Sequence, residues 1–153
     1  MKRVLLLCGI IVLAGCARNT TEVSTQVSQL PIQDIQLVSP SGSVLIVHAE
    51  IASTPAEQEQ GLMQRDHLAP DAGMLFRFAE PQRLTFWMKN TLIPLDILFF
   101  DTEGNFVSSA TMTPCTAEPC TTYSSQGEAL SALEMAAGFT ERHGIGEGWR
   151  IHK

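Results

Sequence analysis

The sequence predicts a mainly β protein: a compact antiparallel β-sandwich or distorted barrel with one or two short helices. Short runs of β-branched and aromatic residues recur along the chain, and clusters containing proline or glycine separate them. The chain has 153 residues, of which 44% are hydrophobic. This length fits one domain that can bury a hydrophobic core of its own. Disordered chains and tandem repeats are therefore poor interpretations.

The N-terminal segment, MKRVLLLCGIIVLAGC, has the features of a secretory signal. Its apolar run is much shorter than the roughly 20 residues that a membrane-spanning helix needs. The last four residues, Leu13-Ala14-Gly15-Cys16, resemble the bacterial lipobox, whose cysteine receives lipid and becomes the first residue after cleavage. An ordinary cleaved signal is the alternative. We expect residues 1–15 to be a lipoprotein signal peptide and Cys16 to attach the protein to a membrane through two or more acyl chains.

The rest of the chain divides into a tether and a domain. Residues 16–31 contain the lipidated cysteine and a polar stretch without apolar periodicity, which predicts a flexible tether. Residues 32–153 form the single β domain. Ala17 follows the cysteine instead of aspartate, which resembles lipoproteins at the periplasmic face of the outer membrane. We therefore expect a protein of the cell envelope.

The charge excludes one large class of partner. The full chain has a net charge of −6, and removal of residues 1–15 leaves 8 basic and 16 acidic side chains, a net charge of −8. A nucleic-acid binder would need a basic stripe on its surface. The same charge disfavours electrostatic attachment to an anionic membrane surface. The expected partners are a membrane, through Cys16, and a small-molecule or saccharide ligand.

The first half of the domain predicts a hairpin followed by a helix. Residues 35–38 and 44–51 are rich in β-branched side chains and flank a turn sequence. Thr54 then precedes a proline, and Glu57 stands at the capping-box position. These signals predict a helix over 55–64.

The second half predicts further strands at short spacing, with one more short helix. Aliphatic and aromatic runs alternate there with turn sequences, and residues 129–135 alternate in a way that favours a strand over a helix. The expected strands are 73–78, 84–89, 95–100, 106–112, 129–135 and 149–152, and the expected helix is 137–143.

Three blocks of sequence resemble a known family. They are GLMQR at 61–65, GMLF at 73–76 and FWMKNTLIPLD at 86–96. In order and spacing they resemble the bacterial and archaeal family called domain of unknown function 192, over about residues 33–152. The resemblance implies a compact β-sandwich-like fold and no particular activity.

The third block predicts a binding platform. If residues 84–90 pair antiparallel with 95–101, Lys89 faces Asp96 on the same face as Trp87, and Asn90 lies at the rim. A tryptophan beside a paired ammonium and carboxylate can bind a small ligand or a saccharide. The alternative is an ordinary cross-strand ion pair beside a half-buried tryptophan.

Glu134 stands out as an acid inside an apolar segment. A buried glutamate needs a partner or a cavity, and Arg65 and Lys89 are the candidate cations. Together with Asp96 it could form the acid and base of a hydrolase that acts on an envelope saccharide or peptide. A structural arginine–glutamate pair is the simpler interpretation.

Cys115 and Cys120 are separated by four residues. In an oxidising envelope such a pair predicts a structural disulfide, with thiol chemistry or metal binding as the alternatives. The histidines and methionines form no tight cluster, so we expect neither a metal nor a cofactor. The preferred function is a binding or accessory module of the envelope; the alternatives are the hydrolase and a structural or protein-interaction lipoprotein.

Overall fold

The computed structural model describes residues 30–152 of the chain. The expected signal peptide at 1–15 and the lipid attachment site at Cys16 lie outside the described residues, as does most of the tether over 16–31. Within the described part, no helix has the length and apolar character needed to cross a membrane.

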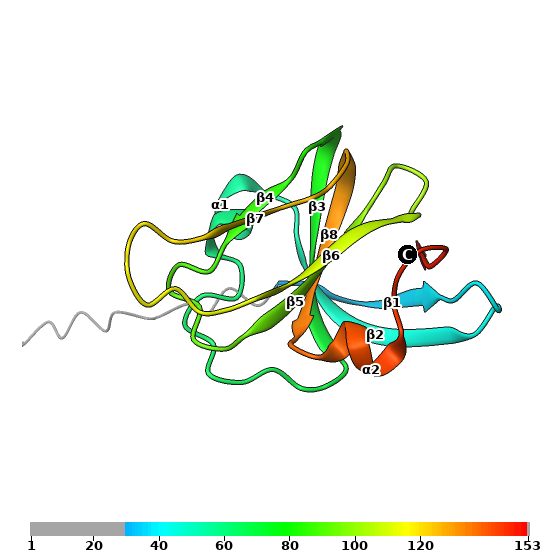
Figure 1. The fold of residues 1–153 in the computed structure, drawn as a ribbon, viewed down its shortest axis with the longest axis horizontal. Helices are drawn as coiled ribbons and strands as arrows, with labels where there is room; N and C mark the ends of the chain where they lie inside the picture. The colour runs from blue at the N-terminus through cyan, green and yellow to red at the C-terminus, as the bar shows by residue number, and fades with distance from the viewer. Residues whose placement is uncertain (1–29, 153) are drawn as a thin grey trace, which may run out of the picture.

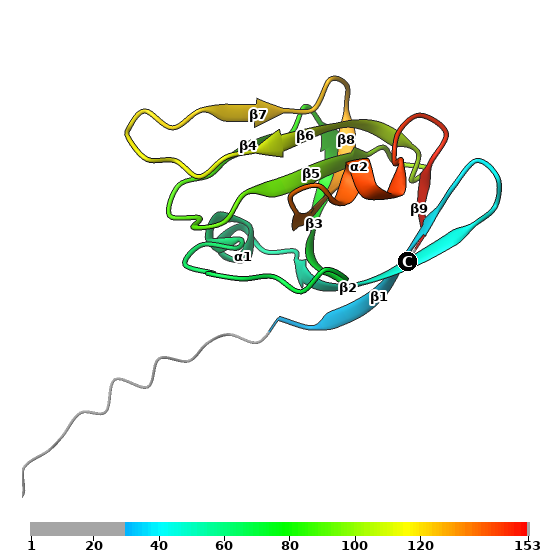
Figure 2. The same cartoon turned by 60° about the horizontal axis from the view of Figure 1, so that its bottom comes forward.

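In the described part of the chain, nine strands form two sheets of unequal size, as the ribbons in Figures 1 and 2 show. The larger sheet has seven strands in the order β6-β5-β8-β3-β2-β1-β9. Its strands are β1 (Ile32–Val38), β2 (Val44–Ala52), β3 (Ala72–Gln82), β5 (Leu95–Phe100), β6 (Phe106–Met112), β8 (Ala129–Ala136) and β9 (Arg150–His152). The smaller sheet pairs β4 (Thr85–Trp87) with β7 (Thr122–Ser124).

The mainly β class with two short helices is confirmed, but the larger sheet is mixed and does not close into a barrel. Strands β2 and β3 run parallel, whereas the other neighbouring strands pair antiparallel. Parallel neighbours need a crossover connection, and helix α1 (Pro55–Gln60) lies in it. The two ends of the sheet approach each other at a single bridge between Asn105 and Arg150.

Each face of the larger sheet carries a hydrophobic core. One face packs around Leu98, Leu133 and Met135, together with Phe139 of helix α2 (Phe139–His143). The other face packs around Ile97 and is covered by the small sheet, as in a sandwich. Consecutive residues of β5 and β8 alternate between these two cores because side chains alternate along a strand.

The first helix begins as predicted and ends earlier. The Thr54 hydroxyl oxygen accepts a hydrogen bond from the Glu57 backbone N–H, and the Thr54 N–H donates one to the Glu57 carboxylate. The helix stops at Gln60 because Gly61 takes a positive φ of 46°. It therefore spans 55–60 instead of the expected 55–64, and the Gln64 N–H donates to the carbonyl oxygen of Asn90, beyond the end of β4.

The expected hairpin between 84–90 and 95–101 is wrong. Strand β4 pairs with β7 in the small sheet, while β5 lies between β6 and β8 in the large one. All six residues of β5 are buried, so this strand requires a neighbour on each edge and a core on each face. Lys89 consequently lies beyond the end of β4 and does not face Asp96.

Candidate functional site

A surface hollow of about 290 Å³ lies between helix α1 and the end of β4. We call it the Trp87 cleft. Its lining residues are Ala56, Glu59, Gln60, Met63, Trp87, Lys89 and Asn90. The Trp87 side chain is unusually open for a tryptophan, with 45% of the residue exposed. The Lys89 Nζ atom lies 5.2 Å from the centre of its ring, within range of a cation–π contact.

Glu134 lies at the bottom of this region. A narrow cavity of about 30 Å³ is lined by Trp87, Lys89 and Met63 on one side and reaches Glu134 on strand β8. Only 5% of Glu134 is exposed, and burial raises the pKa of its carboxyl group to about 8. The carboxyl group therefore holds its proton at neutral pH and can donate a hydrogen bond into the cavity.

The expected partners of Glu134 are both engaged elsewhere. The Arg65 guanidinium lies 2.7 Å from a Glu50 carboxylate oxygen, and the Lys89 ammonium lies 3.3 Å from Glu118. Among residues 30–152, no ion pair involves Glu134. The Glu134 carboxyl group thus has no charged partner among these residues, and the narrow cavity is where it can meet a hydrogen-bond partner.

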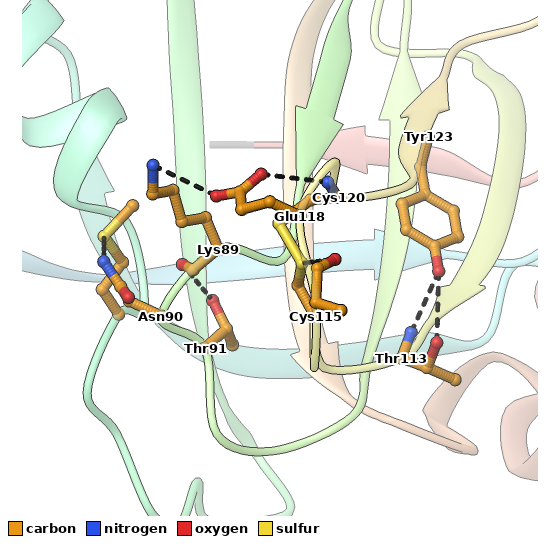
Figure 3. The surroundings of a disulfide bond; sticks show 10 residues. Lys89, Asn90, Thr91, Thr113, Cys115, Glu118, Cys120 and Tyr123 are labelled. Atoms are coloured by element: carbon orange, nitrogen blue, oxygen red, sulfur yellow. Dashed lines mark hydrogen bonds and ion pairs between the residues drawn. A yellow bond between two sulfur atoms is a disulfide. The ribbon is translucent and has the colours of Figure 1, made fainter.

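A second hollow lies on the other side of Lys89. It has a volume of about 310 Å³ and is lined by Lys89, Asn90, Cys115, Thr116, Ala117, Glu118 and Cys120. The expected disulfide joins Cys115 to Cys120 at the ends of this loop (Figure 3). The Cys120 N–H donates to Oε2 of Glu118, whose Oε1 atom faces the Lys89 ammonium. The disulfide loop thus supplies the only described ion-pair partner of Lys89.

The backbone at the edge of the cleft adopts an uncommon conformation. Asn90 and Gln64 both have positive φ angles, 56° and 63°, and the Gln64 N–H donates to the Asn90 carbonyl oxygen at 2.8 Å. Positive φ is infrequent outside glycine, and such residues gather at binding and catalytic sites. The Asn90 amide also contacts the Met63 sulfur at 3.8 Å.

Asp96 does not belong to the cleft. Its neighbour across the ladder is Met135, whereas the neighbour of Glu134 is Ile97, so the two carboxyl groups leave opposite faces of the sheet. Asp96 accepts hydrogen bonds from the Thr111 hydroxyl and from the Thr140 backbone N–H in helix α2. The two residues therefore do not share one face of the sheet, as the expected pairing of a catalytic acid and base in one site requires.

The structure thus brings together four of the six predicted site residues: Trp87, Lys89, Asn90 and Glu134. Arg65 and Asp96 have structural partners outside the cleft. Sequence reasoning missed the contribution of helix α1, of Met63 and of the disulfide loop. A signal for Met63 was present, because it lies in one of the three family-like blocks and Asn90 lies in another. Within the described residues, no group of three or more histidine, cysteine, aspartate or glutamate side chains could hold a metal ion.

Comparison with known proteins gives a family and two similar structures. A family model for DUF192, described as "Uncharacterized ACR", matches residues 37–153. A crystal structure of a proposed transcription regulator from Sinorhizobium meliloti 1021 is 34% identical, with a TM-score of 0.76, and the match covers 81% of this chain and 95% of that one. A protein of unknown function from Novosphingobium aromaticivorans DSM 12444 is 35% identical with the same TM-score, over 84% and 89% of the two chains. No curated protein matches the chain.

Proposed function

The chain belongs to the DUF192 family, an uncharacterised family, and we propose that it is a lipid-anchored envelope protein that binds a saccharide in the Trp87 cleft. The exposed indole of Trp87, bordered by polar side chains, is the observation that carries this proposal. An aromatic ring supplies contact area for the apolar face of a sugar, and a few polar groups around it fix the orientation of the hydroxyl groups.

The cleft offers both donors and acceptors for sugar hydroxyl groups. Asn90 and Gln60 carry amide groups, Glu59 carries a carboxylate, and Lys89 carries an ammonium group. Protonated Glu134 adds a donor deeper in the cavity. This mixture suits a ligand whose hydroxyl groups both donate and accept, which is the property of saccharides.

The envelope location rests on the sequence of the N-terminus. The basic start, the short apolar run and the Leu-Ala-Gly-Cys ending at Cys16 support lipidation. A tether of about fifteen polar residues would let the β domain reach ligands near the membrane surface. The proposed place of action is the periplasmic face of the outer membrane.

One observation favours a second candidate, a protein-interaction lipoprotein. Ile32, Val44 and Ile46 on the β1–β2 hairpin are 66%, 54% and 49% exposed. Val44 and Ile46 lie on the same face of β2, whereas Ile32 lies at the opposite end of the hairpin, across from Glu50. Adjacent exposed apolar side chains, such as those of Val44 and Ile46, mark protein contacts in many proteins. On this alternative the hairpin is the working surface and the Trp87 cleft has no ligand.

Thermal shift measurements on the full chain, in a detergent without a sugar headgroup, test the first proposal. The probes are mono- and oligosaccharides built from N-acetylhexosamines, and the variants are Trp87→Ala and Leu92→Ala. Leu92 is the matched control because it is similarly exposed, at 55%, and lies outside the cleft.

A ligand at a hundredfold excess over its Kd stabilises the folded state by about 2.7 kcal/mol. We expect Tm to rise by several degrees in the wild type and in Leu92→Ala, but not in Trp87→Ala. Equal shifts in all three proteins would overturn the proposed site. The absence of any shift with these saccharides would overturn the proposed ligand class.

A further inference from the structure

We propose that the saccharide site continues past Lys89 onto the disulfide loop, so that the protein takes an oligosaccharide of at least two units. This inference rests on the proposed function and names its ligand more closely. It concerns the second hollow, which the proposal for the Trp87 cleft does not use.

The two hollows are adjacent parts of one surface. The Trp87 cleft and the hollow beside the disulfide loop share two lining residues, Lys89 and Asn90. Their volumes, about 290 and 310 Å³, each lie at the lower limit of the roughly 300–1,000 Å³ found for small-molecule sites. A ligand that lies across both occupies a site well inside that range.

The contacts that hold the Lys89 side chain between the two hollows are weak. Its ammonium group lies 3.3 Å from Glu118 and 5.2 Å from the Trp87 ring centre, and the Lys89 and Glu118 side chains are 43% and 61% exposed. Exposed ion pairs contribute about 0.2–1 kcal/mol, and exposed cation–π contacts about 0.5–1 kcal/mol. A ligand hydroxyl group placed between the hollows can therefore replace either contact, and the lysine then hydrogen-bonds the middle of the ligand.

The outer wall of the second hollow is fixed in place. The disulfide closes the loop, and the Cys115 N–H donates to the Met88 carbonyl oxygen next to Lys89. Further along the same connection, the Thr113 N–H donates to the Tyr123 hydroxyl oxygen (Figure 3). A wall that is ordered before binding reduces the entropy lost when a long, flexible ligand binds.

Calorimetric titration with β-1,4-linked N-acetylglucosamine oligomers of one to four units tests the inference on the full chain. Ala117→Trp fills the second hollow from an exposed loop position, and Leu92→Ala serves as the control. In the wild type and the control we expect affinity to rise at least tenfold from one unit to the longer oligomers. This gain exceeds the few-fold increase that repeating units produce by statistics alone.

In Ala117→Trp we expect single-unit binding within about twofold of the wild type, without the gain for longer oligomers. Binding that does not depend on length, or a length gain that survives in Ala117→Trp, would overturn this inference and leave the Trp87 cleft intact. Failure of every oligomer to bind the wild type would overturn the proposed function and this inference together. The Tm of Ala117→Trp, measured without ligand, separates a blocked hollow from an unfolded protein.

Discussion

Asp96 and Glu134 lie on neighbouring strands and leave opposite faces of the same sheet. Asp96 accepts a hydrogen bond from the Thr140 N–H in the first turn of helix α2, whereas Glu134 lines the narrow cavity beside Trp87. In the register of β5 against β8, Asp96 lies opposite Met135, one residue away from Glu134. Because successive side chains of a strand point to opposite faces, this register puts the two carboxyl groups on opposite faces. One acidic residue is thus a structural group and the other a candidate ligand contact.

Asp96→Asn should lower the free energy of unfolding by about 1–3 kcal/mol. Asp96 is 1% exposed and accepts two hydrogen bonds. An asparagine can keep both contacts only with its NH₂ group facing Thr111, whose hydroxyl must then accept instead of donate, and the hydrogen bonds of a neutral amide are weaker than those of a carboxylate. The bond from the Thr140 N–H is the one that helix α2 depends on, because Gly138 provides no side-chain cap. Urea denaturation measures the loss. Glu118→Gln, which weakens an exposed ion pair, should change stability by no more than about 1 kcal/mol; equal effects would contradict this account of Asp96.

Glu134 should make stability depend on pH. The pKa of its carboxyl group rises from 4.5 in the unfolded chain to about 8 in the folded protein. Between these values the folded protein holds a proton that the unfolded chain releases. Its contribution is therefore fully present below pH 4.5 and is lost as pH rises through about 8, by up to ~1.4 kcal/mol per pH unit.

Glu134→Gln should flatten this part of the profile and unfold at a higher urea concentration than the wild type at pH 8. Glutamine keeps the shape of the protonated side chain but does not ionise. The matched control is Glu128→Gln, an exposed residue near the start of the same strand. Parallel pH profiles for the wild type and Glu134→Gln would contradict the assignment of a buried, protonated carboxyl group.

Gly73→Ala should destabilise the domain by about 1–3 kcal/mol through overcrowding. A Cβ atom at Gly73 would lie 2.6 Å from the backbone oxygen of Glu134 on the facing strand, and backbone cannot move aside cheaply. Gly146→Ala is the control, because no heavy atom lies within 4 Å of a Cβ there. Thermal unfolding compares the two. Equal Tm values would contradict the close approach of β3 and β8 at Gly73.

Replacing both loop cysteines, Cys115→Ser with Cys120→Ser, should lower stability by less than ~3 kcal/mol, because the disulfide closes a short ring. The Cys115 N–H still reaches the Met88 carbonyl oxygen in this variant, so the Trp87 cleft should keep its shape. We expect single sugars to bind as in the wild type and longer oligomers to bind more weakly. Loss of single-sugar binding would contradict the claim that the Trp87 cleft binds one sugar unit without help from the disulfide loop.

Cys16→Ser should release the protein from the membrane. Two or more acyl chains give stable attachment, and without them the −8 charge of the chain after residue 15 opposes binding to anionic lipid. Detergent phase partitioning of the expressed protein measures this: the wild type should enter the detergent phase and the variant the aqueous phase. Equal partitioning of the two proteins would exclude Cys16 as the attachment point.

Local patterns in the sequence predicted most elements of the fold. The β1–β2 hairpin and the capped start of α1 follow from turn residues and side-chain oxygens within a few positions. The expected strand over 129–135 is confirmed as β8, where side chains alternate between the two cores. Strand β7, with three residues and only Tyr123 partly buried, has no pattern long enough to detect.

Pairing between distant segments could not be predicted in the same way. The hairpin expected for 84–90 and 95–101 fits a local register, but β5 pairs with the next strand, β6, on one edge and with the more distant β8 (Ala129–Ala136) on the other. Because all six residues of β5 are buried, both edges and both faces of the strand are covered. The predicted partner of Lys89 was therefore wrong as well. Its ammonium group pairs with Glu118 on the disulfide loop and not with Asp96. Trp87, Lys89 and Asn90 remained together because they are close in sequence, whereas Glu134 joined them only through the order of strands in the sheet.

The fluorescence of Trp87 tests the central claim most directly. The chain has two tryptophans, and Trp149 packs partly buried against the core around Leu98 and Leu133, so Trp149→Phe leaves Trp87 as the only tryptophan and tryptophan-selective excitation reports on it alone. Titration of this variant with the N-acetylglucosamine tetramer should give a saturable change in emission, with the Kd found by calorimetry. Calorimetric binding with unchanged Trp87 emission would place the ligand elsewhere and contradict the proposed site.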